Sequence, residues 1–261
     1  MPDETYPIIF AGAGPGDPDL ITVKAKDALS TADRIIYAGS LVPEAVLKWA
    51  SADSERLNSA SMNLDEIVES MVSGYRAGLR VVRLHTGDPS LYGAIYEQMA
   101  ELSGRSIPYT VIPGVTAAFA AAAAMGIEYT LPEISQTLIL TRMAGRTPVP
   151  DTESLESLAA HRASMAIYLS VSLIDKVADT LAGAYGENAA CAIAYRVSHP
   201  EETILHTRVK DLPRTVRDHG ITRHALIIVG RVLEIAPDRL THVSKLYDRS
   251  FSHGFRAGKA D

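Results

Sequence analysis

The stretch His85-Thr-Gly-Asp-Pro-Ser-Leu-Tyr-Gly93 decides how the rest of this chain is interpreted. It follows the apolar residues Val81, Val82 and Leu84 and precedes a helix-like run over residues 94–102, which predicts a turn between a strand and a helix. In an open α/β sheet, ligands bind beyond the carboxyl ends of the strands, and glycines such as Gly87 let the backbone approach a ligand closely. A purely structural alternative is that Asp88 caps a helix that starts at the following proline.

A second glycine-rich turn, Gly12-Ala-Gly-Pro-Gly-Asp-Pro18, follows an apolar run over residues 6–11 that predicts a buried strand. A helical pattern follows it over residues 22–32. The dinucleotide-binding pattern G-x-G-x-x-G would need a glycine where this chain has Asp17, and the P-loop pattern also fails because no Gly-Lys-Ser/Thr follows. We therefore expect this turn to approach something other than a pyrophosphate, and a nicotinamide oxidoreductase is kept only as a rival function.

Strand and helix patterns alternate along the chain, which predicts an α/β fold with parallel strands and crossover helices. In the first half the predicted strands are 34–37, 80–84 and 108–112, with helices at 63–78, where Asn63 and Glu66 resemble a capping box, and at 115–125. In the second half the predicted strands are 137–141, 165–169, 190–195, 203–209 and 225–232, with a helix from 152 or 154 and others at 173–184 and 211–218. A hairpin-like pair near Glu201 indicates antiparallel strands in this half. The expected domains are residues 1–118 and 119–236, followed by a tail over 237–261.

The composition sets further bounds on the function. Of the 261 residues, 47% are hydrophobic and 21% are charged, as in ordinary globular proteins. The net charge of −6 without a basic block argues against a nucleic-acid surface. No apolar run reaches the roughly 18 to 20 residues that span a bilayer, and the amino terminus is acidic, unlike a signal peptide. The single cysteine, Cys191, fits a cytoplasmic protein, and no spacing of His or Cys suggests a metal site.

Three glycine motifs together resemble the signatures of the tetrapyrrole (corrin and porphyrin) methylases. They are Gly12-Ala-Gly-Pro-Gly-Asp-Pro-Asp-Leu-Ile-Thr22, Gly87-Asp-Pro-Ser-Leu-Tyr-Gly93 and Pro113-Gly-Val-Thr-Ala-Ala118. Within that superfamily, further stretches resemble the precorrin-4 C11-methyltransferases of cobalamin biosynthesis: Tyr37-Ala-Gly-Ser-Leu-Val-Pro43, Leu131-Pro-Glu-Ile-Ser-Gln-Thr137, Thr141-Arg-Met-Ala-Gly-Arg-Thr-Pro148 and Ser198-His-Pro-Glu-Glu202. Cobalt-precorrin-4, uroporphyrinogen III or another precorrin carbon remain alternative targets.

The resemblance implies two α/β domains with S-adenosylmethionine in a cleft between them, and a homodimer. By the same resemblance, the cofactor-binding residues are Pro15, Thr86, Gly87, Asp88, Leu91, Thr116, Ala117, Leu169, Val197 and Ala225. The family often has methionine where this chain has Leu169, a substitution that preserves volume and apolarity. A helix beginning near Gly114 would offer N–H groups to the cofactor carboxylate.

Methyl transfer from a sulfonium needs orientation and exclusion of water rather than a nucleophilic side chain. Asp17 is the candidate for a carboxylate that faces the substrate, with a turn or capping role as the alternative. Because the tetrapyrrole implied by the resemblance carries many carboxylates, Arg142, Arg146 and Arg196 are candidate substrate contacts, unless they are simply solvated. Other residues near the expected cleft are interpreted first as structural: His85 and His199 as hydrogen-bonded histidines, and Tyr37, Tyr92 and Met143 as core residues that could also line the macrocycle.

Overall fold

The structure is a computed structural model of the chain, and it describes residues 6–39, 41–236, 238, 240 and 244–258. The chain forms two compact units: Met1–Ala121 with Arg196–Glu202, and Ala122–Tyr195 with Thr203–Asp261. The expected boundary near residue 118 and the observed division both fall in helix α4 (Ala117–Met125). The segment Arg196–Glu202, expected in the second domain, belongs to the first unit. Of the expected tail, only residues 238, 240 and 244–258 are described.

The first unit is built on a parallel five-stranded sheet in the order β3-β2-β4-β1-β5. Its strands are β1 (Ile8–Gly12), β2 (Arg34–Tyr37), β3 (Glu55–Asn58), β4 (Val81–His85) and β5 (Tyr109–Ile112). Parallel pairing confirms what the alternation of strands and helices predicted for this half. Strand β3 was not predicted, because it lies at the sheet edge and its sequence Glu-Arg-Leu-Asn has no apolar run.

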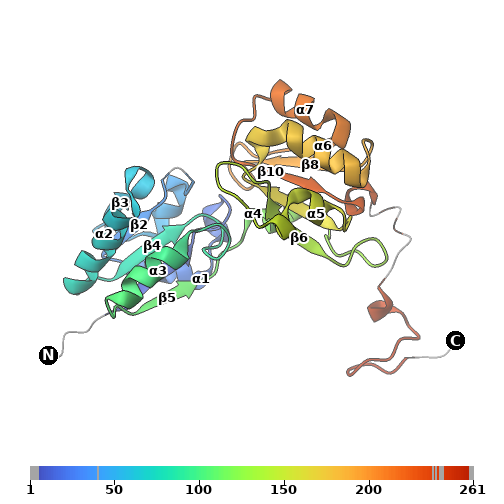
Figure 1. Cartoon of the computed structure of the whole chain (residues 1–261). Helices are drawn as coiled ribbons and strands as arrows, with labels where there is room; N and C mark the ends of the chain where they lie inside the picture. The colour runs from blue at the N-terminus through green and yellow to red at the C-terminus, as the bar shows by residue number, and fades with distance from the viewer. Residues whose placement is uncertain (1–5, 40, 237, 239, 241–243, 259–261) are drawn as a thin grey trace. The chain divides into compact units, whose positions relative to one another are not determined.

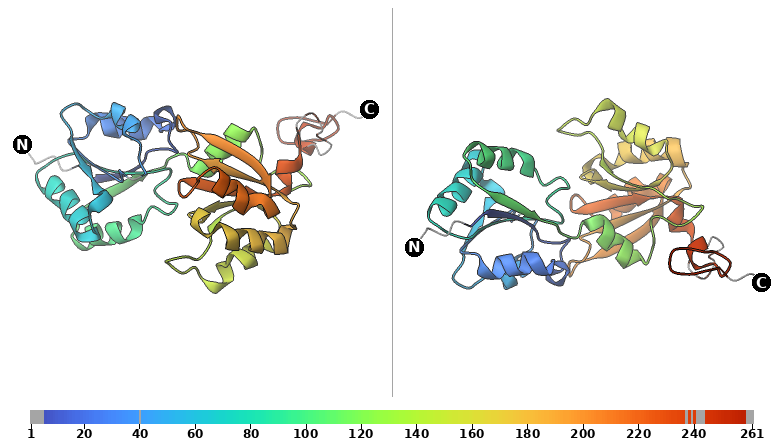
Figure 2. Two further views of the ribbon diagram at one scale, coloured as in Figure 1. Left: turned by 90° about the horizontal axis from the view of Figure 1, so that it is seen from above. Right: turned by 90° about the horizontal axis from the view of Figure 1, so that it is seen from below.

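Helices cover both faces of this sheet, which explains why its strands are apolar on both sides. The covering elements are α1 (Val23–Thr31) and the 3-10 helix Glu44–Trp49 on one face, and α2 (Leu64–Arg76) and α3 (Ile95–Gly104) on the other (Figures 1 and 2). The alternation within a strand is clear in β2, where Ile35 packs into the α1 side and Ile36 into the α2 side. The predicted capping box at the start of α2 is confirmed: Asn63 accepts from the Glu66 N–H at 3.0 Å and Glu66 accepts from the Asn63 N–H at 2.8 Å.

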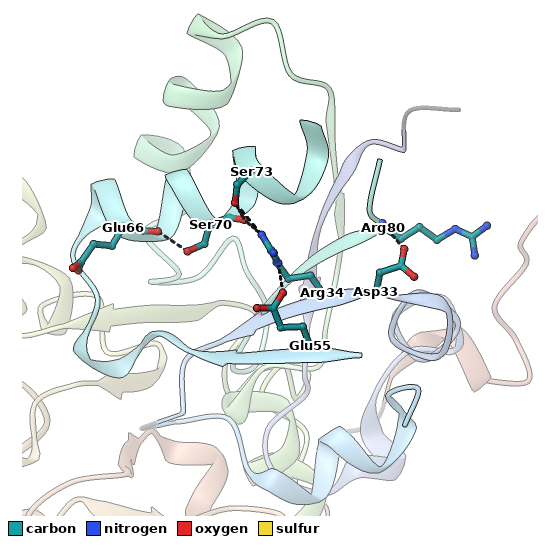
Figure 3. A network of polar contacts seen from close by, with 7 residues as sticks. All are labelled: Asp33, Arg34, Glu55, Glu66, Ser70, Ser73 and Arg80. Atoms are coloured by element: carbon teal, nitrogen blue, oxygen red, sulfur yellow. Dashed lines mark hydrogen bonds and ion pairs between the residues drawn. The ribbon is translucent and has the colours of Figure 1, made fainter. Parts of the chain in front are cut away.

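Hydrogen bonds of charged side chains join the amino ends of the strands in the first unit. Arg34 at the start of β2 donates to the carboxylate of Glu55 at 2.7 Å and to the Ser70 carbonyl of α2 at 2.8 Å. The carboxylate of Asp33 accepts from the backbone N–H of Arg80 at 2.8 Å, just before β4 (Figure 3). These contacts fix the strands and helix α2 to one another at this end of the sheet.

The second unit contains a mixed five-stranded sheet in the order β6-β7-β10-β8-β9. Its strands are β6 (Leu138–Arg142), β7 (Ser164–Tyr168), β8 (Ala190–Tyr195), β9 (Thr203–Arg208) and β10 (Ala225–Val229). Only β6 and β7 are parallel, and the pairs that involve β10 or β9 are antiparallel, as the sequence predicted for this half. One face packs against α5 (Leu155–Ala159), α6 (Ile174–Tyr185) and α7 (Leu212–Asp218) (Figure 1). Among the described residues, no helix combines the length and apolar character needed to cross a bilayer.

Candidate functional site

Three glycines meet where β1, β4 and β5 end. A Cβ added to Gly12 would lie 2.6 Å from both the Gly114 Cα and the Gly87 carbonyl oxygen, and one added to Gly114 would lie 2.1 Å from that oxygen. The loops are also joined by main-chain hydrogen bonds, from the Gly87 N–H to the Gly14 carbonyl at 2.8 Å and back at 3.3 Å. We call Gly12, Gly87 and Gly114 the glycine junction. A side chain on Gly12 or Gly114 would force the loops apart, so the loops pack here backbone against backbone.

Gly87 itself needs to be glycine for its conformation rather than for space. Its φ is +59°, in the left-handed region, and an added Cβ would meet no atom closer than 3.7 Å. The space beside it is therefore open, as a ligand-binding turn requires.

Asp88 joins two of these loops through its carboxylate. One oxygen accepts from the Gly114 N–H at 2.8 Å, and the other accepts from both the N–H and the hydroxyl of Ser90. Burial alone would raise the pKa of Asp88, but the hydrogen bonds from Ser90 and Gly114 outweigh this effect and lower it. Asp88 is therefore ionised at neutral pH. The alternative that it caps a helix is wrong, because α3 begins only at Ile95, after an N-cap at Ala94.

The helix expected from residue 115 begins slightly later than predicted. Helix α4 starts at Ala117, so Thr116, which is buried, precedes its first residue. Both residues lie within three positions of Gly114 of the glycine junction, after Val115. The structure thus places the expected cofactor contacts Thr116 and Ala117 next to those of residues 86–88.

The segment Arg196–Glu202 packs on the first glycine turn. The Ser198 hydroxyl accepts from the Asp17 N–H at 2.9 Å, and the ring of His199 lies so close to Gly16 that an added Cβ there would be 2.3 Å from its Cδ2. The ring also bonds the backbone of Pro15. Burial and the charge of Arg196 lower the pKa of His199, against opposing effects of Glu201 and Pro15. The neutral ring of His199 thus packs against this turn and stabilises it.

Asp17 occupies a capping position in this turn. Its Oδ1 accepts from the Asp19 N–H at 2.8 Å at the start of the 3-10 helix Pro18–Leu20. This is the structural role that the sequence left open as the alternative. The other carboxylate oxygen, Oδ2, is not used in this cap.

His85 is a buried neutral histidine at the end of β4. Only 4% of its surface is exposed, its ring stacks on Phe10 with centroids 6.0 Å apart, and its Nε2 has no hydrogen-bond partner among the described residues. Burial, followed by the charge of Arg83, lowers its pKa to about 3. His85 is therefore neutral at neutral pH and does not serve as an imidazolium acid.

In the second unit, the strand ends display a residue in an unusual conformation. Leu169, directly after β7, has φ +53° and is 66% exposed, which is rare for a leucine. The buried Ser170 hydroxyl donates to the Tyr168 carbonyl at 2.7 Å and accepts from the Met143 N–H at 2.8 Å. Strain of this kind often marks a functional site. Ala225, another expected contact, begins β10 opposite Tyr195 of β8.

The candidate substrate arginines differ in their surroundings. Arg142 donates to the carbonyls of Thr147 at 3.1 Å and Pro148 at 2.6 Å, so it holds the loop that follows β6. Arg146 in that loop is exposed, whereas Arg196 of the first unit pairs with Glu201 at 3.4 Å. Arg146 is thus the most accessible of the three.

The expected site residues fall into two groups. The first unit contains Pro15, Asp17, Thr86, Gly87, Asp88, Leu91, Thr116, Ala117, Arg196 and Val197, and the second contains Arg142, Arg146, Leu169 and Ala225. Three further candidates could line the macrocycle. Tyr37 packs partly into the core of the first unit and Met143 packs against the core of the second. Tyr92 is 44% exposed and has φ +57°. The sequence indicated no role for Ser198 or Ser170, because their hydrogen-bond partners Asp17 and Met143 are distant in the sequence. Across the part of the chain that the structure describes, no group of three metal-ligating side chains is found.

Comparison with known proteins identifies relatives over nearly the whole chain. Residues 7–213 match the family described as Tetrapyrrole (Corrin/Porphyrin) Methylases. A cobalt-precorrin-4 C(11)-methyltransferase from Methanocaldococcus jannaschii is 50% identical over 255 residues, which cover 97% of each chain. A precorrin-4 C(11)-methyltransferase from Pseudomonas aeruginosa is 46% identical over 252 residues, covering 97% of this chain and 99% of that protein.

Solved structures show the same fold. The X-ray structure of a cobalamin biosynthetic enzyme, cobalt precorrin-4 methyltransferase, has a TM-score of 0.84 and 44% identity, covering 87% of this chain and 95% of that one. The uroporphyrin-III C-methyl transferase from Thermus thermophilus, complexed with S-adenyl homocysteine, has a TM-score of 0.72 and 26% identity, covering 88% of this chain and 100% of that one.

Proposed function

Because this chain belongs to the tetrapyrrole (corrin/porphyrin) methylase family, we propose that it methylates precorrin-4 at C11, giving precorrin-5 in cobalamin biosynthesis, with S-adenosylmethionine as the donor. The observation that carries the proposal is the near-complete match to two relatives named for this reaction, at 50% and 46% identity. One of those names specifies a cobalt-containing substrate and the other does not, so cobalt-precorrin-4 is the second candidate.

The residues of the first unit fit the proposed donor. Gly12 and Gly114 allow the three loops to pack backbone against backbone, and an added Cβ on Gly87 meets no atom closer than 3.7 Å, which leaves room for a ligand. By the family resemblance, the residues of this unit that would hold the donor are Pro15, Thr86, Gly87, Asp88, Leu91, Thr116, Ala117 and Val197. The ionised carboxylate of Asp88 would favour the positive part of the ligand. When bound, the donor supplies a methyl group already activated on a sulfonium.

The chain then has to orient the two reactants and exclude water. Correct orientation alone can contribute about 7 to 11 kcal/mol to lowering a barrier. The exposed Arg146, with Arg142 and Arg196, would bind the carboxylates of the macrocycle, because a guanidinium can hold a carboxylate with two hydrogen bonds. Asp17 would face the substrate and accept a proton lost after the methyl group has been transferred.

The cellular setting and the assembly are also proposals. A single cysteine, which lies buried in the core, fits a reducing cytoplasm. A homodimer is proposed from the family resemblance. Light scattering of the purified protein, with a mass of one or two 28.0 kDa chains as the possible results, tests this assembly.

The decisive experiment supplies the purified protein with labelled S-adenosylmethionine and either precorrin-4 or cobalt-precorrin-4. We expect S-adenosylhomocysteine to form with one of them and NMR to locate the new methyl group at C11. A methyl group at another carbon would contradict the proposed position. Calorimetric titration with NAD and NADP is the control for the oxidoreductase alternative, and we expect no binding.

A further inference from the structure

Arg83 is a charged residue buried in the first unit. It lies in the central part of β4, only 5% of its surface is exposed, and it forms no ion pair with any described residue. Burial lowers its pKa to about 10, so it remains charged at neutral pH. A buried charge is costly unless hydrogen bonds compensate for the lost water. The hydrogen-bond partners of Arg83 therefore indicate what role the buried charge has.

On one side, Arg83 fixes the end of β2. Its Nη1 donates to the Ile36 carbonyl at 3.2 Å and to the Ser59 hydroxyl at 3.0 Å. Ser59 in turn donates to the Tyr37 carbonyl at 3.1 Å. The guanidinium is thereby held in one orientation against the last residues of this strand.

On the other side, Arg83 reaches the loop of residues 87–94 through one side chain. Its Nε donates to the Gln98 Oε1 at 3.2 Å, and the Gln98 amide donates to the Ala94 carbonyl at 3.0 Å. Gln98 is 4% exposed, so its amide has no access to bulk water as an alternative partner. The Arg83 contact also fixes which end of the amide is oxygen. The nitrogen must therefore face Ala94.

Ala94 is the point at which this loop needs support. It has φ +49° and is the N-cap of α3 without a side-chain hydrogen bond, and Tyr92 nearby has φ +57°. Non-glycine residues in this region persist only where their surroundings hold them. The opposite end of the loop is held by the bond between Asp88 and Gly114. The loop is thus fixed at both ends, by a carboxylate at one and by the Arg83–Gln98 pair at the other.

We propose that Arg83, acting through Gln98, is a positioning residue that presets residues 87–94 in the donor-binding conformation before any ligand arrives. This inference rests on the proposed function only for the identity of the ligand that the loop would bind. The preset loop itself is a property of the ligand-free protein.

The test separates the two contacts of Gln98. In Gln98→Glu, a carboxylate still accepts from Arg83 but no N–H remains for Ala94. We expect this variant to keep a melting temperature near that of the wild type, because the buried cation gains a counter-ion. We also expect faster amide hydrogen exchange across residues 90–96 in the ligand-free protein and about three- to tenfold weaker binding of S-adenosylhomocysteine by calorimetry. The KM for the donor should rise by a similar factor, with kcat little changed.

Arg34→Gln is the matched control. Arg34 makes a similar set of bonds, to Glu55, the Ser70 carbonyl and the Ser73 hydroxyl, but at the opposite end of the strands (Figure 3). This variant should melt at a lower temperature while its exchange over residues 90–96 and its binding of S-adenosylhomocysteine stay within twofold of the wild type. Wild-type exchange and affinity in Gln98→Glu would overturn the inference. A wild-type protein that binds no S-adenosylhomocysteine would contradict the proposed function, and the exchange data would still decide whether the Gln98 amide positions residues 87–94.

Discussion

The two ends of the sheet in the first unit are built in different ways. At the amino end, charges are paired across elements, as Arg34 is with Glu55 at 2.7 Å. At the carboxyl end, glycines replace side chains at the junction and Asp88 bonds backbone groups. Arg83, in the middle of β4, is buried without an ion pair to any described residue and reaches the loop at this end through Gln98. Strand packing alone needs only the first kind of construction. The second kind is costly, which indicates that this end is organised for a ligand rather than for stability.

The largest effect is expected from filling the glycine junction. In Gly114→Ala, the new Cβ would lie 2.1 Å from the Gly87 carbonyl oxygen, so the loops must separate. We expect a loss of about 2 to 4 kcal/mol in the free energy of unfolding and loss of S-adenosylhomocysteine binding. Denaturant melts and calorimetry measure the two effects.

Gly104→Ala, at the end of α3, is the matched control, because an added Cβ there meets no atom within 4 Å. It should be neutral or slightly stabilising. Equal behaviour of the two variants would show that the junction is not close-packed.

The next largest effect comes from two carboxylates that each accept a backbone N–H. Asp88→Ala removes the bond to Gly114, and Asp33→Ala removes the bond to Arg80, both 2.8 Å long. We expect each to cost about 1 to 3 kcal/mol in the free energy of unfolding. Only Asp88→Ala should weaken S-adenosylhomocysteine binding. Similar affinity losses in both variants would remove the distinction between the two ends of the sheet.

A smaller effect is expected at Asp17. In Asp17→Asn, the amide oxygen can still cap the 3-10 helix Pro18–Leu20, but the negative charge is lost. We expect turnover to fall about tenfold, equivalent to about 1.4 kcal/mol in the barrier, with unchanged binding of the donor. Steady-state kinetics with saturating donor measure it. Unchanged turnover would leave Asp17 with its capping role alone.

At neutral pH the smallest effect, essentially zero, comes from His85, and it grows only as the pH falls. In the unfolded chain its pKa is the ordinary 6.5, whereas in the folded protein it is about 3, so below pH 6.5 only the unfolded state takes up the proton. His85 therefore lowers the free energy of unfolding progressively as pH falls from 6.5 towards 3, by about 1.4 kcal/mol per pH unit. Denaturant melts between pH 7 and 5 should show a shallower decline for His85→Asn. Parallel curves would contradict the assigned burial.

Most strands and helices followed from the sequence because their signals are local. The apolar runs of β1, β4 and β10, and the capping box of α2, each lie within a few consecutive residues. The exposed edge strand β3 has no such pattern. The predicted α/β fold and family resemblance are both confirmed, the second because several motifs matched in order.

The site was harder to predict than the fold, because its contacts join distant parts of the chain. The motif with Gly87 and Asp88 could be recognised in the sequence. The sequence did not show that Asp88 accepts a hydrogen bond from the Gly114 N–H and does not cap a helix. Nothing local indicated that the Ser198 hydroxyl would accept from the N–H of Asp17. Arg83 sits in an apolar run, where a charge signals something unusual, but its partners are identifiable only from the folded structure.

The glycine junction has a consequence for how new specificities could arise in such an enzyme. Peptide groups have the same chemistry whichever amino acid supplies them, so a socket made of main chain holds one shared reagent without depending on side-chain identity. The side chains of surrounding loops, such as that of Arg146, stay available to be exchanged. With the proposed donor bound there, one mode of donor binding could be combined with many differently shaped acceptors.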